Sequence, residues 1–139
     1  MIRNVYSGLL FIGDAASARD LRLLYDSKLN AVVDLAVSEP PAQLGRDLIC
    51  CRFPLHDDGS NSSLLLLTAR HVITTLIQRN HRTLVACSAG MSRSPVMAAA
   101  AISVLTKEPL VDALARVVAD SPRDVSPAFL SSVAKILNS

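Results

Sequence analysis

The sequence lacks a CxxC pair, a run of basic residues and a long hydrophobic segment, and each absence excludes a class of protein. The cysteines Cys50, Cys51 and Cys87 are odd in number and have no metal-ligand spacing, which disfavours a secreted disulfide framework and a metal site. We therefore expect a cytoplasmic protein, kept in a reducing compartment, that binds no metal and no cofactor.

The charge of the chain gives no sign of a large charged partner. The formal net charge is only +2, with the 14 lysines and arginines scattered along the chain, which disfavours binding to nucleic acid or a membrane surface. The longest hydrophobic stretch, Pro95–Leu105, is shorter than the roughly 20 residues of a membrane-spanning helix, so we expect a buried helix there. Residues 1–20 show no signal-peptide pattern, and no secretory leader is expected.

What the chain does have is hydrophobic residues, which make up 50% of its 139 positions. A chain of this length and composition can bury a core without disulfides. No internal repeat or low-complexity linker divides it. We expect a single domain over residues 1–139 that works as a monomer.

Short hydrophobic runs alternate with longer segments of helical periodicity. This alternation predicts an α/β fold: one three-layer domain whose short, mostly parallel central sheet is flanked by helices. Asp14 is the expected N-cap of the first helix, and Leu21, Leu24 and Leu29 are its expected buried face. The predicted strands are 31–36, 48–55 and 83–87, with a strand or hairpin at 5–13; the predicted helices are 14–30, 63–79, 93–106, 110–119 and 127–138; 38–47 is a turn with at most one helical turn, and 56–63 is a polar loop.

The stretch ACSAGMSRS, residues 86–94, places a polar loop between a predicted strand and a predicted helix. This strand-to-helix junction lies at the C-terminal edge of the sheet, where open α/β sheets bind ligands. Backbone N–H groups at a helix N-terminus attract anions, small residues let successive N–H groups turn inward, and a glycine there can adopt backbone conformations that a side chain resists. The loop is therefore a predicted phosphate-binding loop, formed by Ser88, Ala89, Gly90, Met91, Ser92 and Arg93.

Cys87 and Arg93 stand six positions apart, at the two ends of this loop. A thiol at a helix N-terminus beside an arginine loses its proton more readily than a free thiol, which predicts that Cys87 is a nucleophile. The planar guanidinium of Arg93 has donors matched to two phosphate oxygens. Together they predict a site that binds a phosphate monoester and attacks its phosphorus.

A general acid is also needed, because the alkoxide or phenoxide that leaves a phosphate ester must be protonated. The candidates are Asp57 and Asp58, in the polar loop that a parallel neighbouring strand would bring to the same sheet edge as Cys87. The pattern alone leaves both open, and at least one is expected to be a solvated turn residue. His56 adjoins them and is expected to be an exposed loop histidine.

At these residues the sequence resembles the dual-specificity phosphatases, a family of the cysteine-based protein tyrosine phosphatase superfamily. The loop of that family has the form HCxxGxxRS, which this chain matches at Cys87, Gly90, Arg93 and Ser94. FPLHD, residues 53–57, is similar to the family's strand that ends in a Pro-x-x-Asp general acid. The stretches VYSGLLFIGDAASA (5–18) and SPRDVSPAF (121–129) are similar to its N-terminal and C-terminal segments, so the resemblance covers nearly the whole chain.

The resemblance implies a mechanism as well as a fold. Cys87 would form a phosphocysteine intermediate, while Arg93 and the backbone of residues 88–93 hold the phosphoryl oxygens. Asp57, selected over Asp58 by the family pattern, would protonate the leaving group and then activate water. The hydroxyl of Ser94 would assist the second step, and no metal is required.

The chain departs from the family pattern at three places. Ala86 stands where the family has the histidine that helps to organise the loop. Ala128 stands where an asparagine often follows the C-terminal Ser-Pro, and Ser121-Pro122 stands where the family commonly has Arg-Pro.

The expected substrate is a phosphoprotein or phosphopeptide with phosphotyrosine, phosphoserine or phosphothreonine. The loop contains no lysine, whereas phosphoinositide-specific relatives tend to carry basic residues there. The segment before the first strand is too short for the phosphotyrosine-recognition loop of the large tyrosine phosphatases, which implies a shallower pocket.

Three alternatives stay open at this point. The protein could be a phosphopeptide-binding pseudophosphatase, which Ala86 favours, or a rhodanese-like sulfurtransferase or arsenate-type reductase. The third is redox sensing through a disulfide from Cys50 or Cys51 to Cys87. Adjacent strand residues point to opposite faces, so at most one of the two could face the loop, and two small buried side chains are the simpler expectation.

Overall fold

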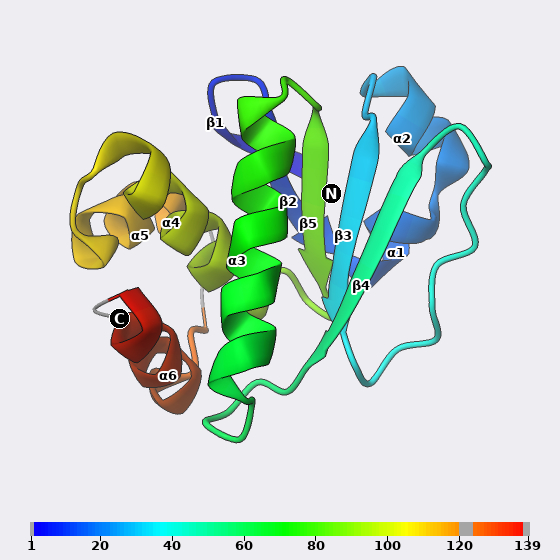
Figure 1. The fold of residues 1–139 in the computed structure, drawn as a ribbon. Coiled ribbons are helices and arrows are strands. Elements are labelled where there is room, and N and C mark those ends of the chain that lie inside the picture. The colour runs from blue at the N-terminus through cyan, green and yellow to red at the C-terminus, as the bar shows by residue number, and fades with distance from the viewer. Residues whose placement is uncertain (1, 120–123, 138–139) are drawn as a thin grey trace.

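The computed structural model describes residues 2–119 and 124–137, which contain five strands and six helices. In chain order they are β1 (Ile2–Tyr6), β2 (Leu10–Asp14), α1 (Ala15–Arg19), α2 (Leu21–Asp26), β3 (Ala31–Ala36), β4 (Ile49–Leu55), α3 (Ser63–Gln78), β5 (Thr83–Cys87), α4 (Arg93–Thr106), α5 (Leu110–Val118) and α6 (Pro127–Leu137). They form one sheet of order β1-β2-β5-β3-β4 (Figure 1). Only β1 is antiparallel to its neighbour, so the predicted mostly parallel α/β sheet is confirmed.

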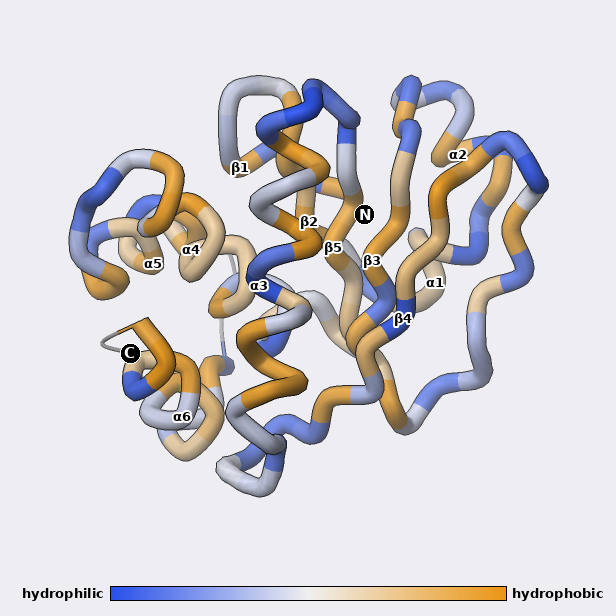
Figure 2. Tube along the Cα trace, in the orientation of Figure 1, coloured by the Kyte–Doolittle hydropathy of each residue, from blue (hydrophilic) through white to orange (hydrophobic). Residues whose placement is uncertain are grey.

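The sheet is covered on both faces, as the hydrophobic character of its central strands requires. Side chains alternate along β5, so that Val85 and Cys87 face the large cluster formed with α3 to α6, while Leu84 and Ala86 face the smaller cluster formed with α1 and α2. Figure 1 shows α3 crossing in front of the sheet, with α1 behind it. The hydrophilic segments lie mainly in the connections, such as the one from β4 to α3 (Figure 2).

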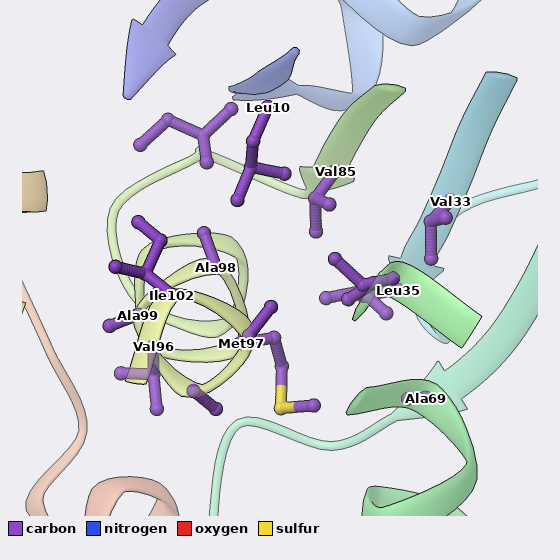
Figure 3. Close-up of a cluster of buried hydrophobic side chains, with 14 of the residues drawn as sticks. Leu10, Val33, Leu35, Ala69, Val85, Val96, Met97, Ala98, Ala99 and Ile102 are labelled. Atoms are coloured by element: carbon purple, nitrogen blue, oxygen red, sulfur yellow. The ribbon is translucent and has the colours of Figure 1, made fainter. Parts of the chain in front are cut away.

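Helix α4 is hydrophobic on all sides and is the central helix of the larger cluster. Ala98, Ala99, Ala100 and Ala101 are fully buried, and their small side chains let the neighbouring elements approach closely. Around them, Met97 points toward Leu35 of β3 and Ala69 of α3, whereas Val96 points to the opposite side of α4, away from the sheet (Figure 3). Each large side chain buried in this way contributes about 1.5–3 kcal/mol. The buried helix expected at this place is confirmed.

The single helix predicted over 14–30 is wrong, because the chain forms α1 and α2 with a break at Asp20. Asp14 caps α1 as predicted. Asp20 has an extended backbone, and its carboxylate accepts a hydrogen bond of 3.1 Å from the amide of Leu23. An aspartate side chain that accepts a hydrogen bond from a nearby backbone amide readily starts a new helix. The break turns Leu21 outward, where it is 38% exposed.

The remaining predictions differ only in detail. The segment at 5–13 belongs to a hairpin of β1 and β2, and the turn at 38–47 contains no helix. Among the residues that the structure describes, no helix combines the length and hydrophobicity needed to cross a membrane.

Candidate active site

The loop between β5 and α4 lies at the C-terminal edge of the sheet. The parallel strands β2, β5, β3 and β4 all end at this edge, so the connections that follow them converge around the loop. The predicted phosphate-binding loop therefore has the position that the sequence implied.

Cys87 is the last residue of β5 and is only 2% exposed. Its Sγ lies 3.2 Å from the hydroxyl of Ser94 and accepts a hydrogen bond of 3.4 Å from the Ser94 amide. Both of these Ser94 groups belong to the first turn of α4, where the partial positive charge of the helix terminus favours an anion. The structure thus places Cys87, the predicted nucleophile, in direct contact with Ser94.

Arg93 is a buried residue, 7% exposed, and its guanidinium lies at the ends of β3 and β4. One nitrogen, Nη1, donates to the carbonyl oxygens of Leu55 at 2.7 Å and Leu35 at 3.5 Å, and Nη2 donates to the Ser88 hydroxyl at 3.0 Å. All of these partners are neutral. Within residues 2–119 and 124–137, no carboxylate lies within ion-pair distance of Arg93, so its buried charge lacks a direct anionic partner and favours a bound anion.

The bend of the loop depends on Gly90, whose backbone is left-handed at φ +73°. A Cβ at this position would lie 3.0 Å from the carbonyl carbon and oxygen of Gly13, at the end of β2. The carbonyl of Ser88 accepts a hydrogen bond of 3.2 Å from the amide of Ala15 in α1. The loop is therefore held closely against the β2–α1 junction.

The structure separates the two candidate acids. Asp57 lies over the loop, where its Oδ1 accepts a hydrogen bond of 2.6 Å from the Ser92 hydroxyl. Asp58 instead accepts from the hydroxyl and amide of Ser60, at 2.5 and 2.8 Å, within its own turn. These hydrogen bonds from Ser60 hold the pKa of the Asp58 carboxyl below its ordinary value, which is suited to a turn residue and not to an acid. His56 is exposed, as expected.

Asp57 and residues of the predicted phosphate-binding loop surround a pocket of about 160 Å³. Its lining consists of Asp57, Cys87, Ser88, Ala89, Met91, Ser92, Arg93 and Asp124. Sequence reasoning missed Asp124, an exposed residue whose amide donates to the carbonyl of Met91 at 3.2 Å. The signal that the sequence gave for it was its place in SPRDVSPAF, residues 121–129, the segment that resembles the family's C-terminal motif.

The departures from the family pattern have different surroundings. Ala86 is fully buried, but it faces the cluster on the α1 side of the sheet, away from Cys87. Ala128 is exposed in the first turn of α6. Ser121 and Pro122 lie outside the described residues.

Cys50 and Cys51 point to opposite faces of β4. Cys51 packs against the larger cluster, on the face of the sheet that also holds Cys87. Because β3 lies between β4 and β5, the two thiols are separated by about 10 Å on strand spacing alone. A disulfide between them would require the backbone to move. Cys50 is exposed and Cys51 is only partly buried, so the expectation of two buried side chains is wrong for Cys50 and is met only in part by Cys51.

Comparisons with known proteins identify the fold. No protein-family model matches the sequence, and no curated protein matches it in sequence. Solved structures do match: human DUSP28 superposes with a TM-score of 0.85 at 22% identity, covering 99% of this chain and 96% of that one. The chain has the dual-specificity phosphatase fold.

Other structures with this fold show the range of molecules built on it. A mouse dual specificity phosphatase complexed with zinc tungstate matches with a TM-score of 0.84 at 22% identity, over 97% of this chain and 85% of that one. A human tyrosine phosphatase-like serine/threonine/tyrosine-interacting protein matches with a TM-score of 0.82 at 18% identity, over 99% of this chain and 95% of that one. At these identities, the likeness concerns the fold.

Proposed function

We propose that this dual-specificity-phosphatase-like domain, residues 1–139, hydrolyses phosphate monoesters on proteins through a phosphocysteine intermediate. The observation that carries the proposal is the buried guanidinium of Arg93, which no described carboxylate neutralises. It lines the same small pocket as the thiol of Cys87. A phosphate bound there would neutralise the arginine and place its phosphorus at the sulfur.

In the first step, the sulfur of Cys87 forms a bond to phosphorus while the bond from phosphorus to the leaving oxygen breaks. Asp57 supplies the proton that the leaving oxygen takes up. Arg93 and the loop amides hold the three remaining oxygens, over which the negative charge of the phosphoryl group is spread in the transition state. The contact between Ser94 and Sγ stabilises the sulfur anion before attack and when it leaves.

In the second step, a water oxygen bonds to phosphorus and the S–P bond breaks, which returns the electron pair to Cys87. Asp57, deprotonated by the first step, accepts the proton of the water. Every group in this cycle belongs to the chain, so we expect turnover in the presence of a metal chelator.

The pocket favours phosphoprotein over phosphoinositide substrates. Among the residues that the structure describes, the charged ones that line the pocket are Asp57, Arg93 and Asp124, so one described cation faces two carboxylates. Another structure with this fold, PTPMT1 at 15% identity, has been crystallised with PI(5)P. A substrate with several phosphates would meet repulsion from both carboxylates here, whereas a single phosphorylated tyrosine, serine or threonine needs only the one arginine.

A second candidate function is phosphopeptide binding without turnover. The structural likeness to a phosphatase-like interacting protein favours it, as does the replacement of the family histidine by Ala86. The presence of Cys87, Arg93 and Asp57 in one pocket favours catalysis. A sulfurtransferase or arsenate-type reductase would use the same loop, but the carboxylate over the pocket is better suited to a substrate with a leaving oxygen.

The test is hydrolysis of an aryl phosphate and of phosphopeptides, with chelator, by the wild type, Cys87→Ser and Asp57→Asn. The matched control is Asp58→Asn, which removes the neighbouring carboxylate. We expect turnover by the wild type, none by Cys87→Ser, and a loss for Asp57→Asn of roughly 10²–10⁴-fold that Asp58→Asn does not show. If the wild type binds phosphopeptides without hydrolysing them, the protein is instead a phosphopeptide-binding protein. If it turns over thiosulfate, it is a sulfurtransferase.

A further inference from the structure

The side chain of Ser92 makes two hydrogen bonds that phosphate binding does not require. Its hydroxyl donates to Oδ1 of Asp57 at 2.6 Å and accepts from the backbone amide of Ser126 at 2.9 Å. Ser92 is only 7% exposed. It therefore joins three separate segments of the chain: the phosphate-binding loop, the loop after β4 and the entry to α6.

The backbone amide of Ser126 fixes the direction of the hydrogen bond between Ser92 and Asp57. A hydroxyl has one proton to donate, and its oxygen here already accepts the amide proton. The Ser92 proton is therefore directed at Asp57, which receives a donated hydrogen bond on one defined oxygen. The amide itself is fixed in turn, because the Ser126 hydroxyl accepts a hydrogen bond of 3.2 Å from Phe129 and so caps α6.

The loop that carries Asp57 also contacts α6. At Gly59, a Cβ would lie 3.5 Å from the Ser132 hydroxyl and 3.8 Å from Cβ of Ala128, so the loop packs against the start of α6. Asn61 closes the loop with hydrogen bonds of 2.8 Å to and from the backbone of His56. The carboxyl of Asp57 is then oriented mainly by Ser92.

We propose that Ser92 is a positioning residue for the general acid, an inference that rests on the proposed phosphatase function. With Oδ1 of Asp57 held by the Ser92 hydroxyl, Oδ2 is left to exchange protons. In the first step, Oδ2 gives its proton to the leaving oxygen while Oδ1, then the carbonyl oxygen, keeps the hydrogen bond. In the second step, Oδ2 takes the proton of water and Oδ1 keeps the same partner. The geometry suits both protonation states of the acid.

The dependence on the leaving group distinguishes this role from a merely structural one. A poor leaving group such as phenoxide needs the acid, whereas a good one such as 2,4-dinitrophenoxide departs almost without it. For Ser92→Ala, we expect kcat/KM to fall about tenfold more for phenyl phosphate than for 2,4-dinitrophenyl phosphate, since general acids contribute roughly 10²–10⁴-fold in all. Ser92→Thr, which keeps a hydroxyl, should restore the wild-type ratio between the two substrates.

Two further variants keep the test decisive. Ser103→Ala also deletes a hydroxyl that donates to a backbone carbonyl, at 2.6 Å from Glu108, but far along α4 from the pocket, and should leave the ratio as in the wild type. In an Asp57→Asn background, Ser92→Ala should change the ratio no further, because residues that act as a unit are not additive.

The outcomes separate the two proposals. If the wild type hydrolyses neither substrate, the proposed function fails. If the wild type turns over and Ser92→Ala lowers both substrates equally, or if its effect adds fully to that of Asp57→Asn, the positioning role is overturned while the phosphatase assignment stands.

Discussion

Replacing Gly90 by alanine should destabilise the protein by more than its backbone conformation alone predicts. A non-glycine residue in the left-handed region costs about 1–2 kcal/mol. The new Cβ would also lie 3.0 Å from two backbone atoms of Gly13 and 3.3 Å from the amide nitrogen of Asp14. Backbone atoms cannot rotate away, and such overpacking adds about 1–3 kcal/mol. The sum, about 2–5 kcal/mol, is a large part of the roughly 5–15 kcal/mol of a typical domain.

Gly8 supplies the matched control, because it is also left-handed, at φ +68°. A Cβ there would meet nothing closer than the end of the Arg82 side chain, at 3.8 Å. Gly8→Ala should therefore cost only the conformational part, about 1–2 kcal/mol. The assay is thermal and denaturant unfolding of both variants, where each kcal/mol lowers Tm by roughly 3–5 °C.

Binding of an oxyanion should be measured on the same two variants. Moving the loop away from Gly13 would turn its amides out of the pocket, so Gly90→Ala should also weaken binding of tungstate, whereas Gly8→Ala should not. Equal destabilisation of the two variants, with tungstate binding kept in both, would refute the reasoning that close contact with β2 shapes the loop.

Three further predictions concern other charged and ionisable groups. Arg82 donates to three backbone carbonyls and lies over an aromatic ring, so Arg82→Met should lower stability by about 2–4 kcal/mol in denaturant unfolding, with aryl phosphate turnover intact at low temperature. Arg93→Lys loses the planar fork and should weaken tungstate binding about tenfold or more, measured by calorimetry. Partial desolvation of the otherwise exposed Cys50 thiol, followed by the carboxylate of Asp34, raises its pKa. Less thiolate is then present at neutral pH, so alkylation of Cys50, mapped by mass spectrometry, should be slow at that pH, accelerate with rising pH, and be faster in Asp34→Asn.

Much of the fold could be predicted from the sequence because its local signals agree with its tertiary structure. The run of alanines in α4 is hydrophobic all round, which only a buried helix explains. The break at Asp20 could not be predicted, because an aspartate within a helical pattern also fits an exposed helix face. Its effect depends on whether the carboxylate finds an amide of the next turn.

The candidate site, too, could be predicted from the sequence only in part. The spacing of Cys87 and Arg93 marks the loop, since both lie within one strand-loop-helix unit. The contact of Ser92 with Asp57 joins residues 35 positions apart, and the approach of Asp124 to the pocket depends on how α6 begins. Such contacts are set by the packing of separate elements, which no local pattern of residues records.

The most direct test of the central claim is to look for the phosphocysteine. The protein would be mixed with an aryl phosphate, quenched rapidly and digested, and its peptides examined by mass spectrometry. We predict one phosphoryl group on the peptide that contains Cys87, transient in the wild type and absent in Cys87→Ser. Turnover by the wild type with no phosphoryl group on Cys87 at any time would contradict the account.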